Sequence, residues 1–316
     1  MARRSDSALA SLLLTNRLTE APAKPLAAGE YWSLIERVED PARLLSLDAA
    51  EVARLLGSTV EHAERVTSLL QVGVALAFEL ERLEQEGFRV LSPFDEGNPA
   101  RLVARLRDAA PPTLVAVGPT SLLDEDGIGI VGSRDVSPAG VEVAREAAEC
   151  ATAAGLSVVS GGARGVDQQA MAAAYQAGGT VVGVLAESML RRVRDPETRR
   201  VVSEGSACLL TPYKPDAGFS VANAMGRNKI IYALSRVTLV VASDLEKGGT
   251  WEGVKEALGR GYGAVSVWLG DGAGPGNRAL VDLGATPVES VGEILEVRPP
   301  SLVYEPESAT QLRLGM

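Results

Sequence analysis

Apolar residues in the second half of the chain fall in short runs that alternate with longer segments of helical periodicity. The runs predict buried strands near residues 127–132, 156–160, 180–185, 207–210, 237–242 and 263–268. The segments between them predict helices near residues 138–154, 165–177, 221–235 and 250–260. Alternating strands and helices are typical of a parallel sheet covered on both faces. We therefore expect an α/β fold with a Rossmann-like, doubly wound, mostly parallel sheet.

The first part of the chain follows a different pattern, in which helical spacing dominates. Short helices are predicted over residues 31–38, 42–47 and 49–56, and a longer helix from Thr59 to about Glu86. Short strands are predicted at residues 89–92 and 114–118. We expect three parts: a small helical N-terminal domain over residues 1–88, a Rossmann-like domain over residues 89–298, and a C-terminal tail over residues 299–316.

Composition narrows the classes of function. The net charge of −10 argues against an evenly basic protein that coats nucleic acid. One histidine, His62, and two cysteines, Cys150 and Cys208, are too few for a zinc cluster and offer no Ser-His or Cys-His couple. Charges and prolines soon follow the apolar run at residues 12–14, so it predicts neither a signal peptide nor a membrane span. We expect a cytoplasmic protein with no cofactor or metal.

Three glycine-containing turns follow predicted strands. The first contains Gly132-Ser133-Arg134, the second runs from Ser160 to Asp167, and the third contains Gly248-Gly249-Thr250. Because carboxyl ends of parallel strands meet at one edge, the turns would form a single cradle of backbone amides, hydroxyls and arginines, which suits a phosphate. No turn matches a P-loop or the G-x-G-x-x-G fingerprint, so ATP hydrolysis is not implied.

A fourth element, Arg227-Asn228-Lys229, lies on the helix that leads to the strand before the third turn. Arg227 and Lys229 are two residues apart, so their side chains diverge on a helix, and one could face the cradle while the other faces solvent. The candidate phosphate-binding residues are Gly132, Ser133, Arg134, Ser160, Gly161, Gly162, Arg164, Gly165, Asp167, Arg227, Asn228, Lys229, Gly248, Gly249 and Thr250.

Roles can be assigned to three of these residues. Arg134 and Arg164 lie in glycine turns at the ends of neighbouring strands and are expected to hold successive backbone phosphates. Asp167 is expected to accept hydrogen bonds from turn amides or to face a neighbouring arginine, rather than to bind Mg²⁺. Glycines and arginines supply no general base at neutral pH, so no catalytic residue is expected.

The ordered motifs resemble the DNA-processing protein A family (DprA, also called Smf). The motifs are Gly132-Ser133-Arg134, Ser160-Gly-Gly-Ala-Arg-Gly-Val-Asp167, Gly226-Arg-Asn-Lys-Ile-Ile231, and Gly276-Asn-Arg-Ala-Leu280 through Gly284-Ala285. The resemblance covers roughly residues 85–290. The family's histidine four residues after the motif aspartate is Met171 in this chain. The resemblance implies a homodimer that binds single-stranded DNA without cutting it and helps to load a RecA-type recombinase during natural transformation.

Two other functions stay open. The wider superfamily includes phosphoribohydrolases that cleave nucleoside monophosphates, whose signature resembles P-G-G-x-G-T-x-x-E. Lys247-Gly248-Gly249-Thr250 is similar, but Gly253 stands where the catalytic glutamate would be, and Glu252 is one residue early. One residue turns a helical side chain by about 100°. The other alternative is a nucleotide-sensing defence module of the same fold.

Overall fold

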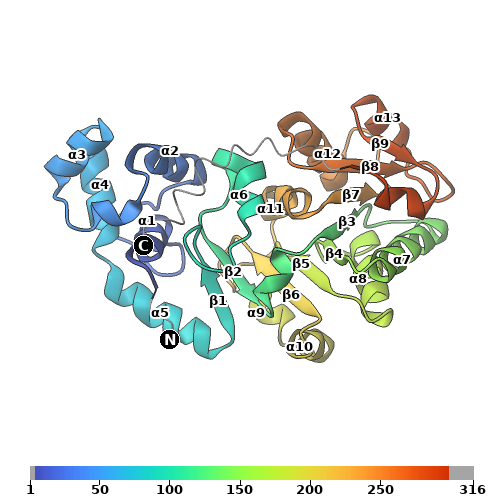
Figure 1. The fold of residues 1–316 in the computed structure, drawn as a ribbon, viewed down its shortest axis with the longest axis horizontal. Coiled ribbons are helices and arrows are strands. Elements are labelled where there is room, and N and C mark those ends of the chain that lie inside the picture. The colour runs from blue at the N-terminus through green and yellow to red at the C-terminus, as the bar shows by residue number, and fades with distance from the viewer. Residues whose placement is uncertain (1–3, 299–316) are drawn as a thin grey trace.

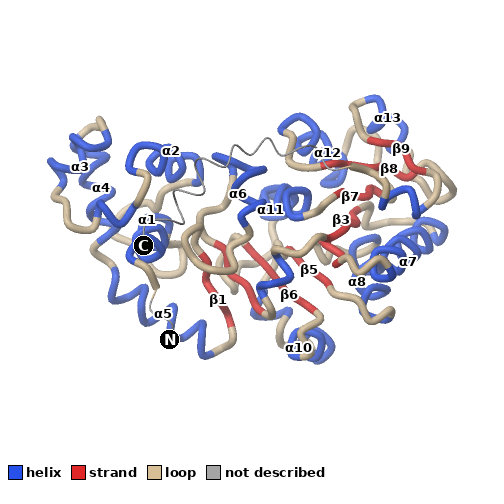
Figure 2. Tube along the Cα trace, in the orientation of Figure 1, coloured by secondary structure: helices blue, strands red, loops and turns tan. Residues whose placement is uncertain are grey.

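In a computed structural model, which describes residues 4–298, a nine-stranded sheet runs through the larger part of the molecule (Figures 1 and 2). Its strand order is β1-β2-β6-β5-β4-β3-β7-β8-β9. The pairs β1–β2 and β2–β6 are antiparallel, and the remaining neighbours are parallel. The strands are β1 (Phe88–Leu91), β2 (Leu114–Val117), β3 (Gly127–Val131), β4 (Ser157–Ser160), β5 (Val181–Val184), β6 (Ala207–Thr211), β7 (Val237–Val240), β8 (Ala264–Trp268) and β9 (Thr286–Val288).

The doubly wound, mostly parallel α/β fold is confirmed. From β3 the chain builds outward through β4, β5 and β6, then returns to the other side of β3 for β7, β8 and β9. Strand order therefore reverses between β3 and β7. In open α/β sheets, ligands bind outside the carboxyl ends of the strands at such a switch point.

Helices cover both faces of the sheet. One face packs on α7 (Pro138–Ala153) and α8 (Val166–Gln176), and the other on α6 (Ala100–Leu106), α11 (Val221–Leu234) and α12 (Gly248–Arg260). Continuous apolar strands such as Val181–Val184 suit a sheet buried on both sides. The other helical segments here are α9 (Met189–Arg192), α10 (Pro196–Ser203), α13 (Asn277–Asp282), η2 (Arg107–Ala109), η3 (Thr120–Leu123) and η4 (Val291–Leu295).

Residues before β1 are helical, as expected. They form α1 (Asp6–Thr15), α2 (Ala28–Val38), η1 (Pro41–Leu44), α3 (Ala49–Leu56), α4 (Val60–Leu70) and α5 (Gly73–Gln85). The long helix predicted from Thr59 to about Glu86 is wrong, because the chain breaks between α4 and α5. Val66 and Leu69 of α4 face the core of the helical bundle, whereas Leu76 and Leu80 of α5 face the sheet. One straight helix could not serve both cores.

The helical segment also shares a core with the sheet. Leucines of α1 and α5 pack against apolar residues of β1, β2 and β6. The leucines are Leu12, Leu13, Leu76, Leu80 and Leu83, and the strand residues are Phe88, Val90, Val115, Val117 and Leu209. Figure 1 shows α5 running beside β1. Within the described range, none of the helices is both long and apolar enough to span a bilayer. The tail predicted at residues 299–316 lies outside the described residues.

Candidate functional site: an arginine-lined groove at the switch point

The three predicted turns meet, because their strands β4, β3 and β7 are neighbours. Backbone hydrogen bonds join them directly. The Ser133 amide donates to the Ala242 carbonyl after β7 (2.8 Å), and the Val166 amide donates to the Ser133 carbonyl (3.3 Å). Ser137 caps α7, because its hydroxyl accepts a hydrogen bond from the Gly140 amide at 3.2 Å. The three turns therefore form one continuous wall at the carboxyl edge of the sheet.

The third turn is fixed from behind by Asn277, which is buried. Its Nδ2 donates to the carbonyls of Val241 and Trp268, each at 2.8 Å, and its Oδ1 accepts from the Ser243 amide at 2.8 Å. Buried backbone groups need such partners. The Asn277 side chain of the Gly276-Asn277 motif therefore has a structural role. It holds the loop after β7 in place and does not enter the groove.

The turns enclose two adjoining hollows, of about 340 and 390 Å³. Arg134, Ala163, Phe219 and Arg227 line both of them. The first is also lined by the predicted residues Gly132, Ser133, Asp167, Asn228, Gly248, Gly249 and Thr250, and the second by Gly161, Gly162 and Arg164. We call the two hollows together the groove. Most of the candidate residues thus lie around one site.

Arg227 is the central cation of the groove, although only 5 % of it is exposed. Gly161 makes room for it, since a Cβ atom there would overlap the guanidinium. Burial lowers the pKa of Arg227, while the nearby Asp167 carboxylate raises it. The Arg227 Nε atom is buried without a hydrogen-bond partner among residues 4–298. A buried guanidinium with unspent donors is suited to an anion in the groove.

Asp167 behaves as the sequence analysis expected. Its Oδ2 accepts from the amides of Gly161 (3.1 Å) and Ala163 (3.4 Å). Burial raises its pKa, and the Arg227 charge together with the turn amides opposes that rise. The carboxylate therefore holds the second turn in shape and balances part of the charge of Arg227.

The rim of the groove carries the other two arginines. Arg164 is largely exposed and donates to the Asp135 carboxylate at 2.6 Å, which links the first two turns. Arg134 lies over the ring of Phe219, with 5.2 Å between its Cζ atom and the ring centroid. Cations favour the face of an aromatic ring. The rim therefore presents two exposed cations beside an aromatic side chain.

Three candidate residues do not line the groove. Gly165 lies outside both hollows and packs against the backbone of the first turn. The Ser160 side chain is fully buried, and its hydroxyl donates to the Ile130 carbonyl at 2.6 Å, so it is not available to a ligand. Lys229 does diverge from Arg227, but it lies half-buried in a different cleft and not in solvent. Asn228 lines the groove, with its Nδ2 donating to the Gly249 carbonyl at 3.1 Å.

Sequence reasoning missed Phe219, which is 52 % exposed and borders both hollows. It stands just before Ser220, whose hydroxyl accepts from the Asn223 amide and caps α11. An aromatic residue directly before the N-cap of the helix that carries Arg227 is the signal that could have found it. Among residues 4–298, no three Asp, Glu, His or Cys side chains are grouped to hold a metal ion.

Comparisons with known proteins identify the family and support the fold. A DprA-named protein of Mycobacterium tuberculosis is 29 % identical over 297 residues, covering 84 % of this chain and 74 % of that protein. Protein Smf of Escherichia coli is 29 % identical over 251 residues, covering 78 % and 66 %. The structure of DNA processing protein A from Streptococcus pneumoniae superposes with a TM-score of 0.67 at 23 % identity, covering 86 % and 98 %. The model of the DNA recombination-mediator protein A family matches residues 89–299, and the chain belongs to that family.

Proposed function

We propose that the groove binds single-stranded DNA and returns it uncut. The observation that carries the proposal is the exposed Phe219 ring under Arg134, next to the buried Arg227. Single strands are held by cations along the phosphates and by aromatic faces on which bases stack. A structure of DNA processing protein A from Helicobacter pylori has been described for its mode of single-stranded DNA binding. It superposes on this chain with a TM-score of 0.55 at 24 % identity, covering 66 % of this chain and 94 % of that one.

The contacts of Asp135 and Asp167, and the position of Glu252, support binding without catalysis; Asp244 and Glu187 are the other acids that line the groove. Asp135 is paired with Arg164, and Asp167 is buried against turn amides. Glu252 lies beside Lys255 (3.4 Å), and Gly253 stands where a phosphoribohydrolase would place its glutamate. A Cβ at position 253 would meet Asn228 Nδ2 at 3.2 Å. A general acid or base must reach the substrate, and these contacts favour a binding protein over a nucleotide hydrolase.

The full proposal includes two further properties that rest on the family. We infer that the protein forms a homodimer in the cytoplasm and delivers bound strands to a RecA-type recombinase during DNA uptake. Sedimentation at micromolar concentration measures the first property, and only monomer would contradict it. Recombinase filament assembly on strands already bound by this protein measures the second, and no acceleration would contradict it.

Binding to oligonucleotides and mononucleotides, followed by product analysis, tests the proposed function. We expect tight oligonucleotide binding, with the strand recovered intact in the presence or absence of Mg²⁺ or Mn²⁺. Release of free base would instead indicate a hydrolase. Saturable binding of one mononucleotide, without oligonucleotide binding or turnover, would indicate a nucleotide sensor.

Substitutions on the rim separate contacts with bases from contacts with phosphates. Phe219→Ala is expected to weaken oligonucleotide binding about tenfold with little change in salt dependence, since stacking releases no counterions. Arg164→Ala should lower the slope of log affinity against log salt by roughly 0.7, with similar losses for all sequences. Asp135→Asn is the matched control: it frees Arg164 from its ion pair and should tighten binding. Unchanged affinity and slope in both Phe219→Ala and Arg164→Ala would remove the rim from the site.

A further inference from the structure

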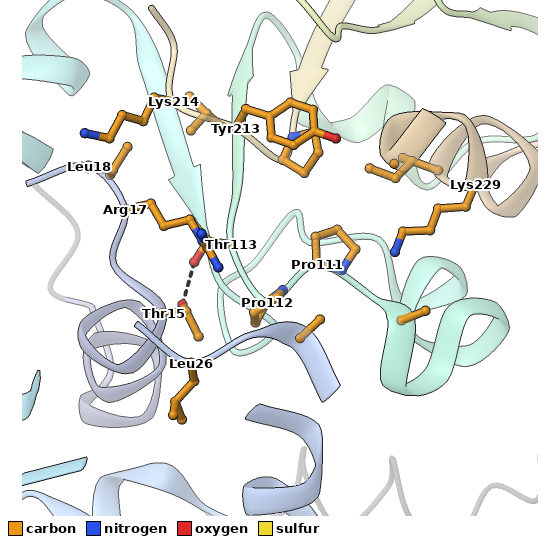
Figure 3. A pocket seen from close by; sticks show the side chains of 16 residues that line it. Thr15, Arg17, Leu18, Leu26, Pro111, Pro112, Thr113, Tyr213, Lys214 and Lys229 are labelled. Carbon is orange, nitrogen blue, oxygen red and sulfur yellow. Dashed lines mark hydrogen bonds between the residues drawn. The ribbon is translucent and has the colours of Figure 1, made fainter. Parts of the chain in front are cut away.

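A second cleft, of about 340 Å³, lies between the N-terminal helices and the sheet (Figure 3). Its walls come from the end of α1 and the loop after it, from residues 109–115 around β2, from residues 212–214 after β6, and from α11. A hydrogen bond of 2.8 Å between the hydroxyls of Thr15 and Thr113 joins two of these walls. Arg227 and Asn228 of α11 line the groove, whereas Gly226, Lys229 and Ile230 line this cleft. The two sites therefore lie on different faces of one helix.

The charge of the cleft is entirely positive. Arg17, Lys214 and Lys229 line it, and none of its lining residues is an aspartate or glutamate. In Figure 3 Arg17 reaches toward Thr113 on one side of the cleft, whereas Lys229 extends from α11 toward Pro111 on the other side, and Lys214 points away from both. The chain as a whole carries a net charge of −10, so a cleft lined by cations and by no carboxylate stands out from it. Such a local positive charge favours the binding of an anion.

Lys229 places a half-buried positive charge in the cleft. Its side chain is half-buried, and it forms no hydrogen bond or ion pair with any residue in the described range 4–298. Burial lowers the pKa of Lys229, while the more distant carboxylates of Glu256 and Asp108 act in the opposite direction. Withdrawing an ammonium from water without a close partner is unfavourable. A bound anion would supply the missing partner.

The remaining walls are mostly apolar or aromatic, among them Leu18, Leu26, Pro111, Pro212 and Tyr213. Small-ligand sites typically combine such walls with a few convergent polar groups, in volumes of roughly 300–1,000 Å³. An arginine fork is suited to two oxygens of one phosphate, and a lysine supplies a point charge beside it. The cleft thus has the size and chemistry for a phosphate with an organic group attached.

We propose that this cleft is a second anion site, in which Arg17 and Lys229 bind a phosphate-bearing ligand from facing walls. The phosphate belongs either to a free mononucleotide or to the backbone of a strand that continues from the groove. The first source is independent of the proposed function, and the second rests on it.

Equilibrium binding of two probes to the full chain, dAMP and an oligothymidylate long enough to span both faces of α11, tests the site. The test variants are Lys229→Met and Arg17→Met, which keep much of the apolar side-chain length and remove the charge. Lys255→Gln on α12 is the matched control, because Lys255 is a lysine outside both sites. Thermal unfolding checks folding, and Lys229→Met should be at least as stable as wild type, since it removes a half-buried charge that has no close partner.

Each result has a defined meaning. An approximately tenfold loss of dAMP affinity in both Met variants, with Lys255→Gln unchanged, supports a free nucleotide as the source. The same loss for the oligothymidylate, without dAMP binding to wild type, supports the strand. If neither probe distinguishes the Met variants from wild type, the second anion site is refuted. Oligonucleotide binding that depends on Arg227 is a separate readout, and its absence would refute the proposed function alone.

Discussion

Arg227→Met is expected to weaken binding of single-stranded DNA about 100-fold, more than any change on the rim. The Arg227 guanidinium is buried at the base of the groove, and its Nε has no partner in the described part of the chain. Two charge-assisted hydrogen bonds to a phosphate at such a desolvated position are together worth about 3 kcal/mol. That free energy corresponds to roughly two factors of ten in affinity. Fluorescence anisotropy with a labelled oligonucleotide measures the effect.

The experiment must separate lost binding from lost folding. Removing Arg227 alone also removes the charge that opposes the rise in the pKa of buried Asp167. The double variant Arg227→Met/Asp167→Asn replaces that carboxylate with a neutral group whose oxygen still accepts from the Gly161 and Ala163 amides. Arg227→Lys retains a charge without the planar fork and should lose an intermediate amount. Wild-type affinity in a double variant that unfolds normally would show that the groove is not the site.

Gly165→Ala is expected to destabilise the protein by roughly 4 kcal/mol, which is severe for one methyl group. Gly165 has a φ of +86°, and its position brings it against the first turn. A Cβ atom there would stand 2.8 Å from the Arg134 carbonyl oxygen and still closer to that of Ser133. Both obstacles are backbone atoms, so a side-chain rotation cannot relieve them. The midpoint of urea unfolding reports the change in stability.

Gly178→Ala is the matched control, because it introduces the strain of a positive φ without the steric clash that a Cβ atom makes at position 165. Gly178 also has a positive φ, +75°, but a Cβ there would meet no atom within 4 Å. Its substitution should cost only about 1 kcal/mol, the penalty for an L-residue in that conformation. Equal losses of stability at the two positions would show that the contact between the first and second turns is unimportant.

The sequence predicted the central strands and the carboxyl edge where the turns meet, because those features depend on local signals, but it did not predict the strand order or β9. Each central strand is a short apolar run, and each turn is marked by glycines that the backbone requires. The alternation of strands and helices along the chain predicts a parallel sheet, and in such a sheet ligands bind outside the carboxyl ends of the strands. The turns that follow the strands therefore come together at that edge. The divergence of Arg227 and Lys229 also follows from helical geometry alone.

What the sequence could not predict depends on packing between distant segments. A two-residue offset shows that Lys229 points away from Arg227, but not that loops 109–115 and 212–214 enclose it in a cleft. Ser160 was a candidate ligand-binding residue, but its hydroxyl donates a hydrogen bond to the Ile130 carbonyl of the neighbouring strand. The contact between Phe219 and Arg134 joins residues that are 85 positions apart in the chain, so the sequence alone does not show it.

The core that α1 and α5 share with the edge strands extends the folding unit beyond the part of the chain that the family model matches. The family match begins at residue 89, inside β1, and so includes strands but not the leucines that cover them. A fragment that begins at that boundary would expose an apolar face of the sheet around Val90 and Val115, and such a patch favours aggregation. A truncated protein is therefore expected to need α1 and α5 to keep this face covered.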